Sequence, residues 1–440
     1  MIPRNQRRDL SAGADTGGRG GVIAIRGVRR LAAAALGLVL VGCGGSSANS
    51  NTTQASSVPY NVLVVSNLSS GAGPANQAFV QGMQAAGNAI NDAGGILGHK
   101  VKFKLTDTGG NNTQSVTLAT QALQAAPDGG GTWNFIQSGA SSDEQLAELP
   151  TVTKYKVPGI AVESSPLLGN PDNFPYHWIL GVNINVMIRT IADYMKALGY
   201  KKVGFFYQNN AVGQASEAAI GPALQGVGID YVKVNYPATA VDLTPQMQQM
   251  QALKPDAVIA TAQSGPWIGY VLKARSALNF NVPFVGDATF SGADAYTIAG
   301  ADLVRGVKYY QWGVNLYVPS DKETPAVKKF RSSLAKVTTS YTQPMHQYAA
   351  GWDSLYLAKL AAEQAKSLDP DKVKAAIDSL KLPASNNPLV TSPKGWGWTP
   401  ASGTGHLSTP GPGAFVICDI GPLSDGQIKV DLSSVYPKAP

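Results

Sequence analysis

Short apolar runs alternate with helical segments along almost the whole chain after residue 59. Val62-Leu63-Val64-Val65 is typical of a buried strand. The next segment places apolar residues four, three and four positions apart, on one face of a helix: Phe79, Met83, Ala86 and Ile90. Gly94-Gly95 ends this helix, and residues 101–105 form the next predicted strand. The pattern predicts a βαβ unit, whose two strands are parallel and whose connection is right-handed.

The same alternation continues to the end of the chain. Further strands are predicted at 133–137, 158–162, 203–207, 231–234, 256–261, 283–286, 415–418 and 428–432. Helices are predicted at 115–124, 146–154, 186–198, 267–278, 325–338, 345–366 and 371–380. This order indicates an α/β fold with parallel sheets. Two such runs meet near residues 176–184, and the length exceeds one ordinary domain, so two similar lobes are expected.

The N-terminal region has the order of a secretory signal, in which basic residues precede an apolar run and small residues. Arg26, Arg29 and Arg30 precede the apolar residues 31–41, a run too short to span a bilayer, which needs about 20 apolar residues. Leu40-Val41-Gly42-Cys43 resembles the lipobox of bacterial lipoproteins, in which the cysteine is acylated. We therefore expect a lipoprotein signal peptide at 1–42, then lipidated Cys43 and a flexible tether over 43–58, rich in Ser, Asn and Thr.

Charge, cysteine and histidine usage exclude several functions. The net charge of +7 falls to about +2 without residues 1–42, so no basic field for nucleic acid is expected. Cys43 and Cys418 are the two cysteines, and Cys418 in an apolar run is expected in a buried strand rather than a disulfide. The four histidines show no metal-ligand spacing, so neither a metal nor a cofactor is expected.

The loops after the predicted strands favour binding over catalysis. They are rich in Ser, Asn, Gln and Gly, which form hydrogen bonds to a small polar ligand at the carboxyl ends of parallel strands. No hydrolase elbow or phosphate-binding loop occurs, so an enzyme is not expected. Glu163 and Asp287 stand at strand ends. They suit a counter-charge for an ammonium group or a helix cap better than an acid–base pair.

Several motifs in fixed order resemble the branched-chain amino-acid type of periplasmic binding protein, the type I solute receptors of ABC importers. The segments that carry the resemblance are Ser70-Gly71-Ala72-Gly73-Pro74, Ile90-Asn91-Asp92-Ala93-Gly94-Gly95-Ile96, Ser141-Ser142, Val157-Pro158-Gly159-Ile160 and Tyr348-Ala349-Ala350-Gly351-Trp352-Asp353. The resemblance spans about residues 59–435. It implies two parallel-sheet lobes, each an αβα sandwich, joined by three crossovers near 180, 282 and 405. Lobe one would be 59–180 plus 283–405, and lobe two 181–282 plus 406–440.

The resemblance also implies a function and its residues. A monomer at the extracytoplasmic face of the membrane, held by its lipid anchor, would bind a small polar metabolite, such as an amino acid or a related amide or acid. It would deliver this ligand to an ABC permease and ATPase. The matching positions are Ser141 and Ser142 for the ligand carboxylate, Ser164 and Ser165 in the next loop, Tyr348 as an aromatic wall and Asp287 as the partner of the ammonium group.

The sequence departs from the family in the side-chain pocket. Val212-Gly213 replaces a Tyr-Gly pair, Ala75 replaces an aromatic residue, and Gln263-Ser264-Gly265 replaces an aromatic turn. Tyr207 and Trp267 either compensate for these losses or belong to the core. A branched-chain amino acid is therefore not assumed as the ligand. An exported sensor that signals to a membrane partner with the same fold remains the alternative to an importer subunit.

Overall fold

The computed structural model describes residues 56–71, 73–139, 141–262, 265–398, 405–411 and 413–437. The expected signal segment, Cys43 and most of the tether lie outside this part of the chain, as do Gln263 and Ser264. No helix within the described ranges is both long enough and apolar enough to cross a membrane.

Lobe one is built on a parallel sheet with β1 (Tyr60–Ser66) at its centre. Its order is β2-β1-β3, with β2 (Val101–Asp107) and β3 (Trp133–Ser138) on either side. The parallel pair β4 (Gly159–Ala161) and β5 (His177–Ile179) continues it beside β3, where the Ile136 N–H donates to the Pro158 carbonyl at 2.9 Å.

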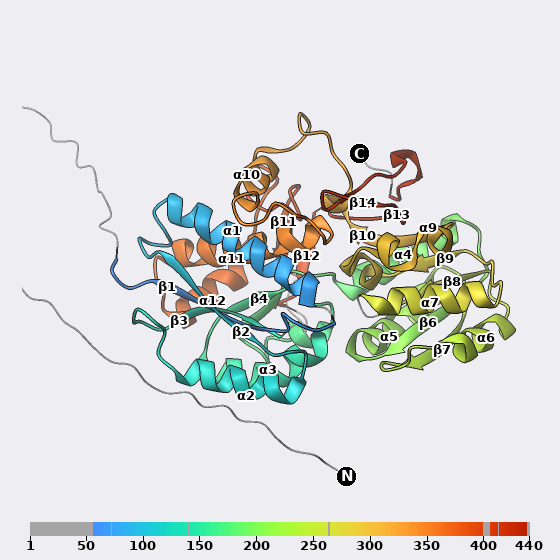
Figure 1. Cartoon of the computed structure of the whole chain (residues 1–440), viewed down its shortest axis with the longest axis horizontal. Coiled ribbons are helices and arrows are strands. Elements are labelled where there is room, and N and C mark those ends of the chain that lie inside the picture. Colours follow the sequence, from blue (N-terminus) through green and yellow to red (C-terminus); the bar gives the residue numbers. More distant parts are fainter. Residues whose placement is uncertain are drawn as a thin grey trace, which may run out of the picture. The chain divides into compact units, whose positions relative to one another are not determined.

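Helices cover both faces of this sheet, because alternate residues of β1 point into two separate cores. Val62 and Val64 pack in the core that contains α1 (Gly73–Asp92) and α11 (Met345–Ala365). Leu63 and Val65 pack in the core that contains α2 (Asn112–Gln124) and α3 (Ser142–Tyr155). Figure 1 shows these two pairs of helices on opposite sides of β1. A continuous apolar run is what a strand buried on both faces requires.

Lobe two has a six-stranded sheet with the order β13-β10-β9-β8-β6-β7. Its strands are β6 (Lys202–Asn209), β7 (Asp230–Pro237), β8 (Ala257–Ala260), β9 (Phe284–Gly286), β10 (Val307–Trp312) and β13 (Phe415–Asp419). All neighbours pair in parallel except β13, which is antiparallel to β10.

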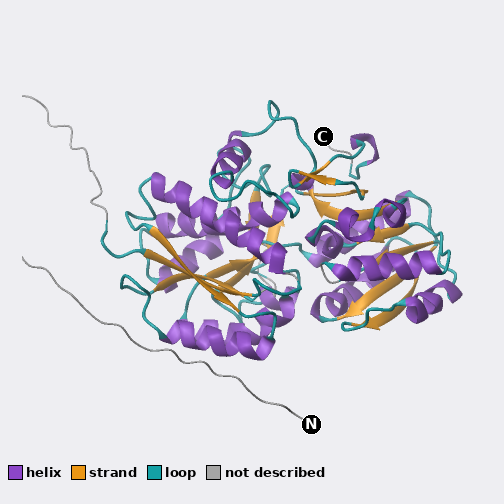
Figure 2. Cartoon of the chain, viewed as in Figure 1, coloured by secondary structure: helices purple, strands orange, loops and turns teal. Residues whose placement is uncertain are grey.

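The lobe-two sheet is also covered on both faces (Figure 2). Phe205 packs with the helices of one face, α4 (Ile184–Ala197) and α5 (Ala211–Gly226). Phe206 packs with those of the other, which are α6 (Thr244–Ala252), α7 (Pro266–Ala277), α8 (Ala295–Ala299) and α9 (Ala301–Val304). The predicted α/β architecture, with two lobes that are each an αβα sandwich, is therefore confirmed.

The remaining elements are short or lie between β10 and β13 in the chain. They are α10 (Pro325–Leu334), α12 (Pro370–Ser379), β11 (Trp396–Trp398), β12 (Ser408–Pro410), β14 (Leu423–Ser424), β15 (Gln427–Ile428) and the 3-10 turns η1 (Pro166–Gly169), η2 (Ala288–Gly292), η3 (Gly313–Asn315) and η4 (Leu432–Ser434). Helices α10 and α12 contribute Phe330 and Ile377 to the core of α1 and α11, and so belong to lobe one.

Two predicted lobe boundaries are wrong. Strands β9 and β10 pair with β8 in the second sheet, so residues 284–312 belong to lobe two, and the second crossover follows Trp312 rather than residue 282. Leu407 bridges Ile179 and β12 pairs with β11, so the chain stays in lobe one until Pro410 rather than leaving near 405. In each case the chain forms a further short strand, β9 or β12, in the lobe that it was expected to have left.

The C-terminal segment combines one correct and one wrong prediction. Cys418 lies fully buried in β13, as expected for a strand residue of the core. The expected strand at 428–432 is reduced to the two residues of β15 and is followed by η4. Asp431 explains the break, because its carboxylate accepts a hydrogen bond from the Ser433 N–H and begins a turn.

Candidate functional site

A cavity of about 210 Å³, called here the inner cavity, is lined by residues of both lobes. Lobe one contributes Ala75, Asn76, Ser141, Ser142, Asp143, Val162, Glu163, Ser164, His346 and Gln347. Lobe two contributes Asn210, Val212, Ala238, Ala262, Ala288, Thr289, Gly292 and Trp312, and Val182 lies in the first connection between the lobes. Most of these residues follow a parallel strand or begin a helix, which is where α/β folds place their ligands.

The N-terminus of α3 carries the predicted serines. Ser141 is the N-cap, and its hydroxyl accepts a hydrogen bond from the Glu144 N–H at 3.2 Å. Ser142 is the first helical residue, and its hydroxyl accepts from the Ser165 N–H at 3.3 Å. Ser141, Ser142 and Ser164 line the inner cavity, whereas Ser165 is fully buried behind it. The structure thus brings three of the four predicted serines to one wall.

Glu163 is an acidic side chain of the same wall. Its Oε2 accepts hydrogen bonds from the Gln145 side-chain amide at 2.7 Å and from the Val162 N–H at 3.1 Å. Burial raises the pKa of this carboxyl to about 7, although the hydrogen bonds from Gln145 and Val162 act in the opposite direction. Gln145 is itself held by the His177 ring, whose Nε2 lies 3.2 Å from the amide oxygen. Burial lowers the pKa of His177 to about 3, so this ring carries no charge at physiological pH.

Asp287, expected as the partner of an ammonium group, does not line the inner cavity. It is fully buried, and its Oδ1 accepts from the Thr289 N–H at 3.0 Å and from the Thr289 hydroxyl at 2.5 Å. Asp287 is thus the N-cap of η2, which agrees with the helix-cap alternative. Thr289, whose hydroxyl also accepts from the Ala262 N–H at 2.9 Å, reaches the cavity in its place.

The three predicted aromatic residues are also absent from the lining. Tyr348 is buried in the lobe-one core, with Tyr341 packed edge-on at 5.7 Å. Tyr207 is buried and stacks on Phe205 at 4.9 Å. Trp267 packs against the lobe-two core and donates from its indole N–H to the Ala238 carbonyl at 3.1 Å. Tyr207 and Trp267 therefore follow the core alternative, and Trp267 holds the backbone of a lining residue.

Two rings that were not predicted from the sequence line the inner cavity instead. Trp312 and His346 stack with their centroids 5.5 Å apart and their planes 12° from parallel. The His346 Nδ1 lies 3.0 Å from the Asn315 side-chain nitrogen and 3.3 Å from its side-chain oxygen, and burial lowers the pKa of His346 to about 3, so the ring is neutral. Trp312 ends β10, so the rule that ligands bind beyond strand ends would have found it, had β10 been recognised.

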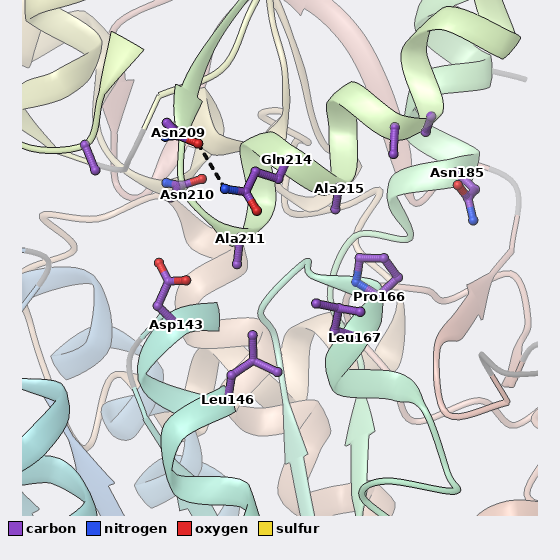
Figure 3. Close-up of a pocket in the computed structure, with 13 residues that line it drawn as sticks. Asp143, Leu146, Pro166, Leu167, Asn185, Asn209, Asn210, Ala211, Gln214 and Ala215 are labelled. Atoms are coloured by element: carbon purple, nitrogen blue, oxygen red, sulfur yellow. Dashed lines mark hydrogen bonds between the residues drawn. The ribbon is translucent and has the colours of Figure 1, made fainter. Parts of the chain in front are cut away.

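Beside the inner cavity lies a larger space of about 750 Å³, called here the outer cavity, which shares Asp143, Asn210 and Ala238 with it. Figure 3 shows Asp143, Leu146, Pro166 and Leu167 of lobe one across this space from Asn209, Asn210, Ala211, Gln214 and Ala215 of lobe two. The Gln214 amide donates to the Asn209 side chain at 2.9 Å. One wall is thus rich in amides, and the opposite wall is mostly apolar.

The described lining of the two cavities is polar but holds no metal-binding cluster. Within the described residues, no group of three or more His, Cys, Asp and Glu side chains is placed to hold a metal ion. The lining groups are hydroxyls, amides, two carboxyls, small apolar side chains and the Trp312–His346 pair. This arrangement is suited to hydrogen bonding and stacking with a small polar molecule.

A family model, a curated relative and solved structures all relate this chain to binding proteins for small solutes. A family model described as "Periplasmic binding protein" matches residues 59–406. A curated relative, the Leu/Ile/Val-binding protein homolog 8 of Brucella abortus, is 22% identical over 324 residues, which cover 69% of this chain and 76% of the relative. A leucine binding protein from Thermotoga maritima has a TM-score of 0.68 at 18% identity and covers 85% of this chain and 98% of its own. A Rhodopseudomonas palustris solute binding protein solved with 4-hydroxybenzoate has a TM-score of 0.70 at 19% identity, with coverages of 87% and 98%.

Proposed function

Because this chain belongs to the periplasmic binding protein family, we propose that it captures a small polar metabolite in the inner cavity and delivers it to an ABC importer at the membrane. The proposed ligand class is an amino acid or a related amide or acid. A lipid anchor on Cys43 keeps the protein at the extracytoplasmic face of the membrane.

The observation that carries this proposal is the shared lining of the inner cavity. Ser142 and Glu163 come from lobe one, whereas Asn210 and Thr289 come from lobe two. A ligand that touches both sets is bound most tightly when the two lobes approach each other, so it shifts the population toward the closed form. A permease that recognises the closed form would then distinguish a loaded receptor from an empty one.

Relatives support the ligand class without fixing it. The curated relative is named as a homologue of a Leu/Ile/Val-binding protein, and one structural neighbour was solved with an aromatic acid. The inner cavity has Ala75 and Val212 at positions where the family pattern has aromatic residues. It has the Trp312–His346 pair on another side. This redistribution of rings supports a solute that differs from the branched-chain amino acids.

The decisive experiment is a thermal-shift screen of amino acids, their amides and aromatic acids against the purified protein. A ligand that binds the native state alone raises the melting temperature, by an amount that grows with its concentration over Kd. Calorimetry then gives the affinity and the stoichiometry of each hit. If no compound of these classes shifts the melting temperature at millimolar concentration, the proposed ligand class is wrong.

Ser142→Ala is expected to weaken ligand binding by about 1–3 kcal/mol, because a buried hydroxyl of the cavity wall is lost. Titration calorimetry with the strongest hit of the screen measures this change. The matched control is Ser332→Ala, which removes an exposed hydroxyl on α10, bonded to the Lys329 carbonyl, away from both cavities. Equal affinity for Ser142→Ala and wild type would remove this hydroxyl from the binding site.

Cys43→Ser is expected to release the protein from the membrane fraction, because serine offers no thiol for the acyl group. Fractionation of the native host, followed by immunoblotting, measures the membrane-bound share. Cys418→Ala is the control: this cysteine is buried in β13 and plays no part in anchoring. Membrane retention of Cys43→Ser at the wild-type level would contradict the lipid anchor.

A further inference from the structure

The inner cavity has acidic side chains but no basic one in its described lining. Asp143 and Glu163 are its two ionisable acids, and no Lys or Arg takes part. Its one histidine, His346, is kept neutral by burial, which lowers its pKa to about 3. A ligand carboxylate would therefore meet hydroxyls and backbone N–H groups but no full positive charge. The charge of the cavity favours solutes that bring hydrogen-bond donors.

Among the described acidic residues near the cavity, Glu163 is the one positioned as a fixed acceptor in its wall. Asp143 is exposed at the junction with the outer cavity, and Asp287 is fully buried as the cap of η2. Glu163 is held from behind by Gln145, whose amide donates at 2.7 Å and whose side chain is buried against the neutral His177. An acceptor fixed by a buried amide loses little conformational freedom when a ligand binds.

We propose that Glu163 is the residue that determines solute specificity, and that the solute offers it an N–H donor, either a protonated amine or a primary amide. This inference rests on the proposed function. A donor on the ligand forms a charge-assisted hydrogen bond with the carboxylate. A ligand without a donor adds no hydrogen bond to this carboxylate while it displaces water from it, and an anionic group beside it is repelled.

The first test uses the wild-type protein and needs no variant. Two series are titrated by calorimetry at pH 7.5: leucine, leucinamide and isopentylamine against 4-methylpentanoate, and benzamide against benzoate. Within each series, the compounds with an N–H donor are expected to bind about tenfold more tightly, or better, than the donor-free acid of the same shape. A donor-free acid that binds as tightly as its donor-bearing partners overturns the role of Glu163.

The second test changes the acceptor while keeping its size. Glu163→Gln presents an amide that also donates, so the preference for benzamide over benzoate, or for leucine over 4-methylpentanoate, is expected to fall about tenfold. Glu363→Gln is the control, because this half-buried residue pairs with Lys359 on α11, outside both cavities. The melting temperature without ligand verifies that both variants are folded.

The outcomes separate the inference from the function on which it rests. An unchanged preference in folded Glu163→Gln overturns the inference alone, since the protein still binds solutes. Binding of benzoate or 4-methylpentanoate by the wild type as tight as that of the matching donor-bearing compounds has the same meaning. Absence of binding by every compound of the broad screen contradicts the proposed function, and the inference with it.

Discussion

Gly82→Ala is expected to lower the free energy of unfolding by about 3 kcal/mol, because no room exists for a methyl group between α1 and α11. A Cβ built at Gly82 would lie 1.8 Å from the Tyr348 carbonyl oxygen, which is backbone and cannot rotate away. In an unobstructed helix the same change would be favourable by about 1 kcal/mol, since alanine has the higher helix propensity. The clash outweighs the gain in helix propensity, so the net effect of Gly82→Ala on the free energy of unfolding is a loss.

Thermal or chemical denaturation of Gly82→Ala measures this loss, and two further variants show its cause. Gly226→Ala, at the exposed end of α5, adds a methyl group with no atom within 4 Å and is expected to be neutral or slightly stabilising. Gly351→Ala clashes across the same interface, where its Cβ would lie 1.9 Å from the Phe79 carbonyl. Because separating the helices once relieves both clashes, the double variant should lose less than the sum of the single losses. Full additivity would contradict a shared close contact.

The same helix pair connects stability with binding. Ala75 and Asn76 lie in the first turn of α1, and His346 and Gln347 lie in the first turn of α11, and all four line the inner cavity. Gln347 also donates to the Gly292 carbonyl of lobe two at 2.9 Å. Moving α1 away from α11 therefore displaces two walls of the site, so we expect Gly82→Ala to weaken ligand binding as well.

The parts of the fold that the sequence predicted are those where a single physical pattern dominates. The continuous apolar run of β1 and the helical spacing of α1 are local signals, and both elements form where expected. The serines at the start of α3 were predicted because the loop after a parallel strand is a general ligand position and because Ser141-Ser142 matches the family's pattern. Such features depend on few residues and on no distant partner.

The features that escaped prediction depend on contacts far apart in the sequence. β9 has only three residues, and nothing local shows that it pairs with β8 rather than returning to lobe one. Burial of Asp287 and exposure of Glu163 to the cavity depend on which of two strand-end loops turns inward, and the sequence shows both simply as acids at strand ends. Trp312 and His346 meet from segments that the sequence separates by α10.

Asp353→Ala is expected to cost about 4 kcal/mol of folding free energy, because it leaves three buried donors without their acceptor. Asp353 lies fully buried on α11. Its Oδ1 accepts from the Val390 N–H at 2.8 Å, and its Oδ2 accepts from the Thr391 N–H at 2.8 Å and the Thr391 hydroxyl at 2.6 Å. These bonds fix the segment that places Leu389 and Val390 in the lobe-one core.

Denaturation at pH 7 measures the loss in Asp353→Ala, and Asp302→Ala is the control because its ion pair with Arg305 is almost fully exposed and contributes little. Thr391→Val removes one of the three donors and should have a smaller effect, of about 1 kcal/mol. A loss for Asp353→Ala no greater than that of the control would mean that the segment is held by its apolar contacts alone.

A pH series adds a readout that lost packing would not change. Burial raises the pKa of Asp353 from 3.8 to about 7, so between these values the native state holds a proton that the unfolded state has lost. This group therefore contributes stability that is complete below about pH 4 and declines as the pH rises toward 7. Removing the carboxyl should make the decline of stability across this range shallower in Asp353→Ala than in the wild type. An equally steep decline in both would show that Asp353 is ionised throughout, held so by its three donors.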